Sequence, residues 1–197
     1  MVAPPQGTAV TERIPLFPLD AVVFPGEAFP LHVFEERYLV MLEDCETKGL
    51  PVGVALARPE GEVEHPPVEV GTACRIMASE KLPDGRRIVL TAGEHRFRVR
   101  GVVSDRLYQE ADVEWLDEPL GDMDAAERAE SRVRRELARI GAEPVAEDAE
   151  GPIETSYAVA AALEAPATLR QRLLESESAE ERLELEEAIL RQLAPDE

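Results

Sequence analysis

Three histidines are the side chains in this sequence best suited to hold a metal ion or to transfer a proton near neutral pH. His32, His65 and His95 lie 30 or more residues apart, so none shares the close spacing of a metal-binding motif. We interpret each as a strand or loop residue and expect no metal site. A small hydrolase becomes the better interpretation only if the fold brings His32 and His95 together beside a carboxylate.

Two further pairs of residues carry nucleophilic groups. Ser79 and Lys81 are two residues apart, which on a strand places both side chains on one face. Lys81 adjoins a predicted hairpin turn, and we interpret this pair as structural. Cys45 and Cys74 fall at apolar positions, which is typical of buried, unreactive thiols. The sequence also lacks a P-loop, a nucleophile elbow and a C-x-x-C pair, so we expect a non-catalytic protein without a cofactor.

The charge of the chain restricts its partners. The 197 residues include 21 basic and 41 acidic side chains, a formal net charge of -20. Such a surface repels phosphate, which argues against broad binding to nucleic acids or anionic membranes. The first residues have neither the basic nor the apolar region of a secretory signal, and no apolar run is long enough to cross a bilayer. We therefore expect a cytoplasmic protein with two reduced thiols.

One segment reverses this charge. Residues 75–106 contain eight basic and four acidic side chains. Its arginines either pair with carboxylates elsewhere in the fold or bind an acidic partner. Nucleic-acid binding is thus an alternative function, although the net charge opposes it. The candidate basic strip comprises Arg86, Arg87, Arg96, Arg98 and Arg100.

Aromatic residues and prolines concentrate in residues 14–38, which hold five of the nine aromatic side chains of the chain. Two interpretations are compatible with each other. These side chains form the core of a β-rich part, or they line an apolar groove beside proline-interrupted edge strands, where an extended peptide adds as a further strand. The candidate peptide-binding residues are Phe24, Phe29, Phe34, Arg37 and Tyr38.

Short apolar runs separated by turn signals predict the β-rich part that positions these residues. Proline within the first runs favours edge or interrupted strands over central ones. One helix interrupts the strands at residues 35–48, because Tyr38, Met41, Leu42 and Cys45 share an apolar face. The pattern indicates an antiparallel sandwich or barrel. The expected strands are 14–19, 21–26, 28–34, 52–57, 70–79, 86–92, 94–103 and 108–116.

After residue 117 the period of the apolar residues changes from two to about 3.6, which predicts helices. The expected helices are 122–140, 152–163, 168–174 and a last one that begins at a capping box of Ser178 and Glu181. The chain therefore divides into a flexible tail (1–12), a β-rich domain (13–117) and a helical subdomain (118–197). This segregation of strands and helices is an α+β organisation.

Several ordered motifs of the β-rich part resemble the Lon protease N-terminal, substrate-binding domain family. They are IPLFPL at 14–19, VFPG at 23–26, FPLHVFEERY at 29–38, VGTACRI at 70–76, LPDG at 82–85 and GEHRFRV at 93–99. The resemblance implies a PUA-like pseudo-barrel of antiparallel strands with one early helix, followed by a C-terminal helical bundle.

The resemblance also implies a function. It indicates a module that binds protein substrates, partner proteins or unfolded polypeptide, without protease activity. Because 197 residues leave no room for the ATPase and protease domains of the full-length enzyme, we expect a stand-alone form of the domain. It implies no particular oligomeric state and no small set of binding residues.

Overall fold

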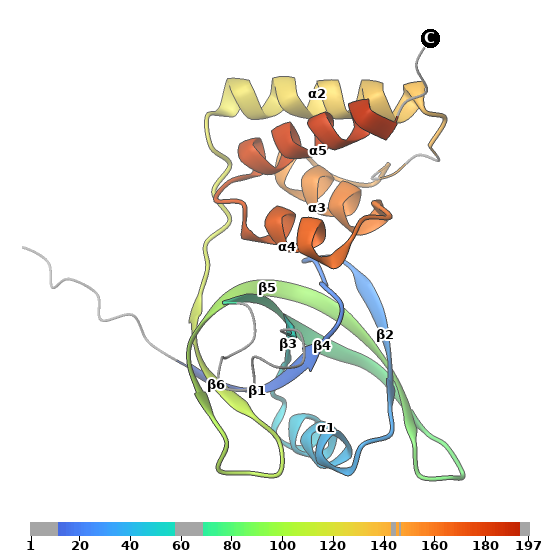
Figure 1. Ribbon diagram of the computed structural model, residues 1–197, viewed down its shortest axis with the longest axis vertical. Helices are drawn as coiled ribbons and strands as arrows, with labels where there is room; N and C mark the ends of the chain where they lie inside the picture. The colour runs from blue at the N-terminus through green and yellow to red at the C-terminus, as the bar shows by residue number, and fades with distance from the viewer. Residues whose placement is uncertain (1–11, 58–68, 143–144, 146, 194–197) are drawn as a thin grey trace, which may run out of the picture.

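The computed structural model describes residues 12–57, 69–142, 145 and 147–193. The tail expected at residues 1–12 lies outside this part of the chain except for Glu12, which already belongs to a strand. Figure 1 shows a β part that holds one helix and, stacked on its opposite end, a layer of four helices. This confirms the α+β fold class. None of the helices within the described residues is long and apolar enough to cross a membrane.

Six strands and one helix build the β part. They are β1 (Glu12–Leu19), β2 (Ala28–Val33), α1 (Glu36–Lys48), β3 (Val52–Leu56), β4 (Val70–Lys81), β5 (Arg87–Val103) and β6 (Glu110–Trp115). Neighbouring strands follow the order β2-β5-β4-β3-β1-β6, and β6 also pairs with β5. Five strands therefore form a ring of pairings, and β2 is attached to β5 outside this ring.

Strand β1 closes the ring in two halves. Residues 12–15 pair with β6, and residues 16–19 pair with β3. Each half has a neighbouring strand on one side. The strand can therefore contain Pro15 and Pro18, because proline lacks the N–H group that a central strand needs for pairing on both sides. The pairing of β1 with β3 is parallel, so the expectation of a wholly antiparallel sheet was wrong for this pair. The chain between them, through β2 and α1, is long enough to return in the same direction.

Strand β5 runs unbroken through Gly93, where two separate strands were expected. Residues 21–26, also expected as a strand, instead form a segment that crosses β5 at this point. The Gly26 N–H donates to the Gly93 carbonyl, and the Gly93 N–H donates to the Glu27 carbonyl, both at 2.9 Å. A Cβ at Gly93 would lie 2.2 Å from the Phe24 carbonyl oxygen, so the close crossing requires glycine.

Four helices form the second layer: α2 (Met123–Arg139), α3 (Pro152–Ala162), α4 (Ala167–Glu175) and α5 (Ala179–Leu193). Helix α4 lies nearest the β part and α2 farthest from it (Figure 1). The Asp122 side chain caps α2, and the Ser178 hydroxyl accepts from the Glu181 N–H at the start of α5. The apolar core of the helices extends into the β part, where it includes Phe24.

Arg96 of β5 joins the two layers. It is 3% exposed, and its Nη1 donates to the carbonyl oxygens of Leu174 and Ser176 at 2.7 Å each. These carbonyls lie at the C-terminal end of α4, where a helix leaves carbonyl groups without intrahelical partners. The Nε of Arg96 pairs with the Glu118 carboxylate at 2.9 Å. A cation from the sheet thus caps a helix of the other layer.

Arg170 of α4 makes a second connection between the layers. Its Nη2 donates to the Val22 carbonyl at 3.0 Å and lies 3.2 Å from the Glu27 carboxylate. Its guanidinium covers the Phe24 ring, 4.8 Å from the centroid. Its Nη1 donates to three carbonyls at the end of α3. The helices are therefore held to the sheet by buried polar contacts as well as by apolar packing.

We predict that Arg96→Met destabilises both layers together. The substitution leaves the buried carbonyls at the end of α4 without a donor, so the free energy of unfolding falls by about 2–4 kcal/mol. Urea denaturation followed by circular dichroism measures this change. Arg100→Met is the matched control, because Arg100 forms an exposed ion pair with Glu114 and its loss changes stability by less than about 1 kcal/mol. Equal effects of the two substitutions would contradict the capping role of Arg96.

Helix α5 carries a buried carboxyl group whose state depends on pH. Glu186 is fully buried, and neither of its carboxyl oxygens has a hydrogen-bond partner among the described residues. Loss of hydration raises the pKa of Glu186 well above its usual value, although the nearby Arg182 lowers it. The folded protein therefore favours the uncharged acid, whereas the unfolded chain ionises near pH 4.5.

We predict that Glu186→Gln makes the protein more stable than the wild type at neutral pH but not at pH 4. As the pH rises above 4.5, ionisation favours the unfolded wild-type chain, and its stability falls relative to the variant by up to about 1.4 kcal/mol per pH unit. Urea denaturation of both proteins between pH 4 and pH 8 tests this. A stability difference that does not change with pH would show that Glu186 does not titrate as argued.

Candidate functional site

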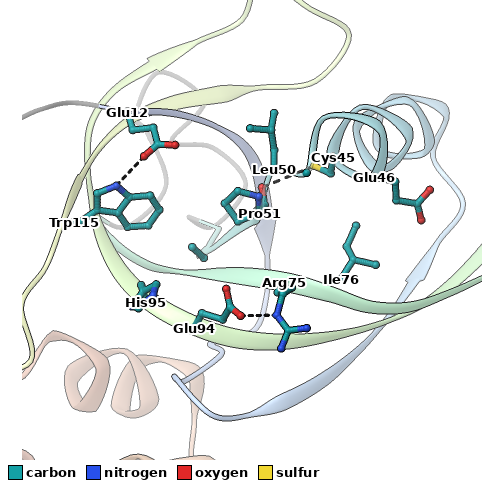
Figure 2. Close-up of a pocket in the computed structure, with 12 residues that line it drawn as sticks. Glu12, Cys45, Glu46, Leu50, Pro51, Arg75, Ile76, Glu94, His95 and Trp115 are labelled. Carbon is teal, nitrogen blue, oxygen red and sulfur yellow. Dashed lines mark hydrogen bonds and ion pairs between the residues drawn. The ribbon is translucent and has the colours of Figure 1, made fainter.

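A hollow of about 530 Å³ opens on the surface of the β part, between the end of α1 and strand β6 (Figure 2). We name it the Trp115 hollow. Trp115 and His95 lie at one end of it, and Cys45 and Glu46 of α1 lie at the other. Its lining is completed by Glu12, Gly49, Leu50, Pro51, Ala73, Arg75, Ile76 and Glu94. Much of this lining is apolar, and charged groups stand at its margins.

Trp115 forms a fixed aromatic wall of this hollow. Its side chain is half-exposed, at 37%. The indole Nε1 donates to the Glu12 carboxylate at 3.0 Å, and the His95 ring lies edge-on to the indole with centroids 6.4 Å apart. A held, half-exposed indole presents an apolar face at little cost in side-chain entropy.

An ion pair borders the other side of the hollow. Arg75 Nε lies 2.5 Å from Glu94 Oε1, and both side chains are exposed (Figure 2). An exposed ion pair contributes little to stability, so its groups are available to a ligand at small cost. The guanidinium offers donors and the carboxylate offers acceptors, which suits the peptide groups of an extended chain.

The groups with nucleophilic potential are not activated. Burial raises the pKa of Cys45 and of Cys74 to about 12, so both thiols stay protonated at neutral pH. His32 and His95 do not meet. His32 pairs with residue 88 of β5, seven residues along the strand from His95, and its ring contacts Phe34 instead. These two histidines therefore do not form the arrangement that would have favoured a hydrolase.

The predicted peptide-binding residues do not form one surface. Phe24 is buried beneath Arg170, and Tyr38 is buried with its ring 4.2 Å from that of Phe17. Phe29 is half-buried in β2. Phe34 and Arg37 are exposed, Phe34 to 65%. Arg37 pairs with Glu35 at 2.7 Å and lies over the ring of Tyr38.

Other exposed apolar side chains lie on the same part of the surface as Phe34. Ile88 and Leu90 of β5 are exposed and pair with His32 and Pro30 of β2, so they share the outer face of the sheet. Exposed Met77 lies at the irregularity of β4 on the neighbouring strand. We name this surface, made by Phe34, Met77, Ile88 and Leu90, the β2–β5 apolar face.

The predicted basic strip is divided among internal partners. Arg86 pairs with Asp84, Arg87 with Glu46 and Arg100 with Glu114. Arg96 is buried at the junction described above, and Arg98 is half-buried with its Nε lacking a partner among the described residues. Most of this positive charge is thus neutralised by carboxylates of the same chain, which is the first of the two interpretations given for these arginines.

The sequence did not point to the Trp115 hollow. Its residues come from β1, the end of α1, the loop between α1 and β3, and strands β4, β5 and β6, so no local pattern joins them. One signal was available: the only tryptophan of the chain stands at the end of a predicted strand, where a large side chain is easily left half-exposed.

A second hollow, of about 740 Å³, lies between the β part and helix α3. We name it the α3 hollow. Glu94 and His95 line both hollows, so these two residues form the ridge between them. The rest of its lining comes from the turn of Pro25, Gly26 and Glu27, from Glu118, from residues 147–149, and from Ile153, Glu154, Tyr157, Ala158 and Ala161.

Comparison with solved structures places this fold among known domains. The Lon N-terminal domain protein from Xanthomonas campestris superimposes with a TM-score of 0.68 and 27% identity, over 93% of this chain and 99% of that one. The N-terminal domain of the Mycobacterium avium complex Lon protease has a TM-score of 0.73 at 14% identity, over 91% and 98% of the two chains.

Sequence comparison gives the same result. Lon protease 2 of Desulfotalea psychrophila is 30% identical over 194 residues, which cover 89% of this chain and 24% of the relative. The Lon protease of Lawsonia intracellularis is 34% identical over 119 residues, or 58% of this chain and 14% of the relative. The chain thus matches about a quarter or less of the length of these proteases. The family model of the ATP-dependent protease La (LON) substrate-binding domain matches residues 13–192, and the chain belongs to that family.

Proposed function

We propose that this chain is a non-catalytic module that binds unfolded polypeptide or partner proteins, with the Trp115 hollow as its main contact. The observation that carries the proposal is the match to a substrate-binding domain family over residues 13–192, which is nearly the whole described chain. The relatives that share it are proteases, whose substrates are proteins. The protonated thiols and separated histidines agree with a role in binding.

The geometry of the Trp115 hollow supports this role. Its volume accommodates one bulky side chain, and its walls provide an indole and several aliphatic groups. Burial of apolar surface contributes about 25 cal/mol per Å², and tryptophan is among the residues that dominate binding energy at protein interfaces. The ion pair of Arg75 and Glu94 at the margin offers donors and acceptors to the main chain of a ligand.

The β2–β5 apolar face supports a second, weaker contact. It lies beside β2, which is attached to the sheet on one side, so an extended chain can add to its free edge. Phe34, directly after this strand, and Arg37, in the first turn of α1, are the two predicted peptide-binding residues with exposed side chains. Pro30 lacks a backbone donor, which limits such pairing to short segments.

The same proposal assigns the protein to the cytoplasm. Cys45 and Cys74 are both unpaired and buried, as suits a reducing compartment.

We predict that Trp115→Ala weakens the binding of reduced, carboxymethylated α-lactalbumin, a permanently unfolded probe, by about tenfold. Fluorescence anisotropy of the labelled probe measures the dissociation constant. Trp115→Phe keeps an aromatic wall without the indole donor and retains most of the affinity. Met123→Ala removes an exposed apolar side chain outside the hollow and leaves binding unchanged. Wild-type affinity in Trp115→Ala, with the fold intact by circular dichroism, would remove the hollow from the proposal.

We also predict that Phe34→Ala lowers affinity for the same probe by about threefold, because it trims the β2–β5 apolar face without opening the core. Because the Phe34 side chain is exposed, the substitution changes the free energy of unfolding by less than about 0.5 kcal/mol, and thermal denaturation checks this. Leu107→Ala, at an equally exposed apolar position between β5 and β6 and outside this face, serves as the control. Equal binding by both variants would show that the face takes no part.

A further inference from the structure

The α3 hollow differs from the Trp115 hollow in its charge. Its lining contains neither lysine nor arginine, and His95 is its one basic side chain. Six carboxylates line it: Glu27, Glu94, Glu118, Glu147, Asp148 and Glu154. A concave site with charges of one sign attracts groups of the opposite sign, and the low-dielectric walls strengthen this attraction.

The carboxylates fall into two groups of three. Glu27, Glu118 and Glu94 each have an arginine partner: Arg170 and Arg96 at the junction of the layers, and Arg75 beside the ridge. Glu147, Asp148 and Glu154 are exposed, and within the described residues none of them pairs with a lysine or arginine. Their negative charge is therefore available to a ligand. Glu154 also accepts the Glu150 N–H, which fixes its carboxylate at the start of α3.

The α3 hollow also has apolar lining. Pro25 and the α3 residues Ile153, Tyr157, Ala158 and Ala161 contribute it. A lysine or arginine side chain matches this combination, because its aliphatic stem packs on apolar surface while its charged head reaches a carboxylate. A small inorganic cation would gain nothing from the apolar lining.

The position of the α3 hollow connects it to the first site. Glu94 and His95 line both hollows, so an extended chain that crosses this ridge contacts both at once. Linking two weak contacts in one ligand raises affinity without any new contact type.

We propose that the α3 hollow binds lysine or arginine side chains of the same polypeptide whose bulky apolar residue occupies the Trp115 hollow. The inference rests on the proposed function and names its substrate class: unfolded segments in which basic residues stand near aromatic or large aliphatic ones. The formal net charge of -20 adds a long-range attraction that favours encounter with such segments.

Two fluorescein-labelled peptides of 16 residues test this proposal. They share a central tryptophan and differ only in four flanking positions, which are lysine in one and glutamine in the other. Fluorescence anisotropy gives the dissociation constants at low and high salt. We expect the lysine peptide to bind about fivefold more tightly at low salt, with the difference lost in high salt because the contacts are exposed.

Two double variants with equal changes of charge separate a local effect from a global one. D148N/E154Q neutralises two available carboxylates of the hollow and retains an acceptor at 154, so it removes most of the preference for lysine. E127Q/E184Q neutralises two exposed glutamates of α2 and α5 outside the hollow and keeps the preference. Equal loss in both variants would overturn the proposal, since the net charge alone would then explain the preference.

The outcomes also distinguish this inference from the proposed function. If the two peptides bind equally well and both lose affinity in Trp115→Ala, the binding function holds and the lysine preference falls. If neither peptide binds, both proposals fall. A third measurement uses spermine, a free polycation. If spermine binds as tightly as the lysine peptide and loses the same affinity in D148N/E154Q, the hollow binds free polycations and the inference is overturned.

Discussion

The arrangement of the two layers depends on buried arginine side chains that bind carbonyl groups at helix ends. Removing a guanidinium from water costs several kcal/mol unless its donors find good acceptors. Arg96 and Arg170 find them at the C-termini of α4 and α3, where the carbonyls lack intrahelical partners and the helix dipole is negative. Because each arginine also binds a group of the other layer or is anchored in it, the layers have one preferred orientation. The α3 hollow exists because this orientation holds α3 beside the turn at Pro25.

The same contacts decide which aromatic residues reach the surface. Arg170 covers Phe24, and Arg182 lies 3.8 Å from the centroid of the Tyr157 ring, whose hydroxyl donates to Glu118. These rings serve the junction and leave only part of their surface to a ligand. Phe34, by contrast, lies beyond the end of an edge strand and stays mostly exposed, with its ring edge-on to that of His32. The concentration of aromatic residues in 14–38 is therefore mostly core, and its exposed member belongs to the β2–β5 apolar face.

The helices and most strands followed from the sequence because their signals are local. The 3.6-residue period marked α2 and α5, the capping box at Ser178 marked the start of α5, and alternation marked the strands. The continuity of β5 could not be predicted from the sequence, because a glycine at position 93 suggests a break between two strands. Only the segment that crosses β5 explains why glycine is needed there. The burial of Arg96 could not be predicted either, since its acceptors lie about 80 residues further along the chain. The Trp115 hollow combines six segments, and only the three-dimensional fold brings them together.

The charge pattern links the fold to the proposed selectivity. Most basic residues of the β part form ion pairs with carboxylates of the same chain, such as Arg87 with Glu46 and Arg100 with Glu114. Residues 117–197 contain 22 acidic and nine basic side chains, so their negative charge cannot be balanced within the layer. That excess opposes the association of exposed apolar faces of two copies, because like charges repel. A segment with basic residues escapes this repulsion, so in the proposed function the charge that opposes self-association also favours basic ligands.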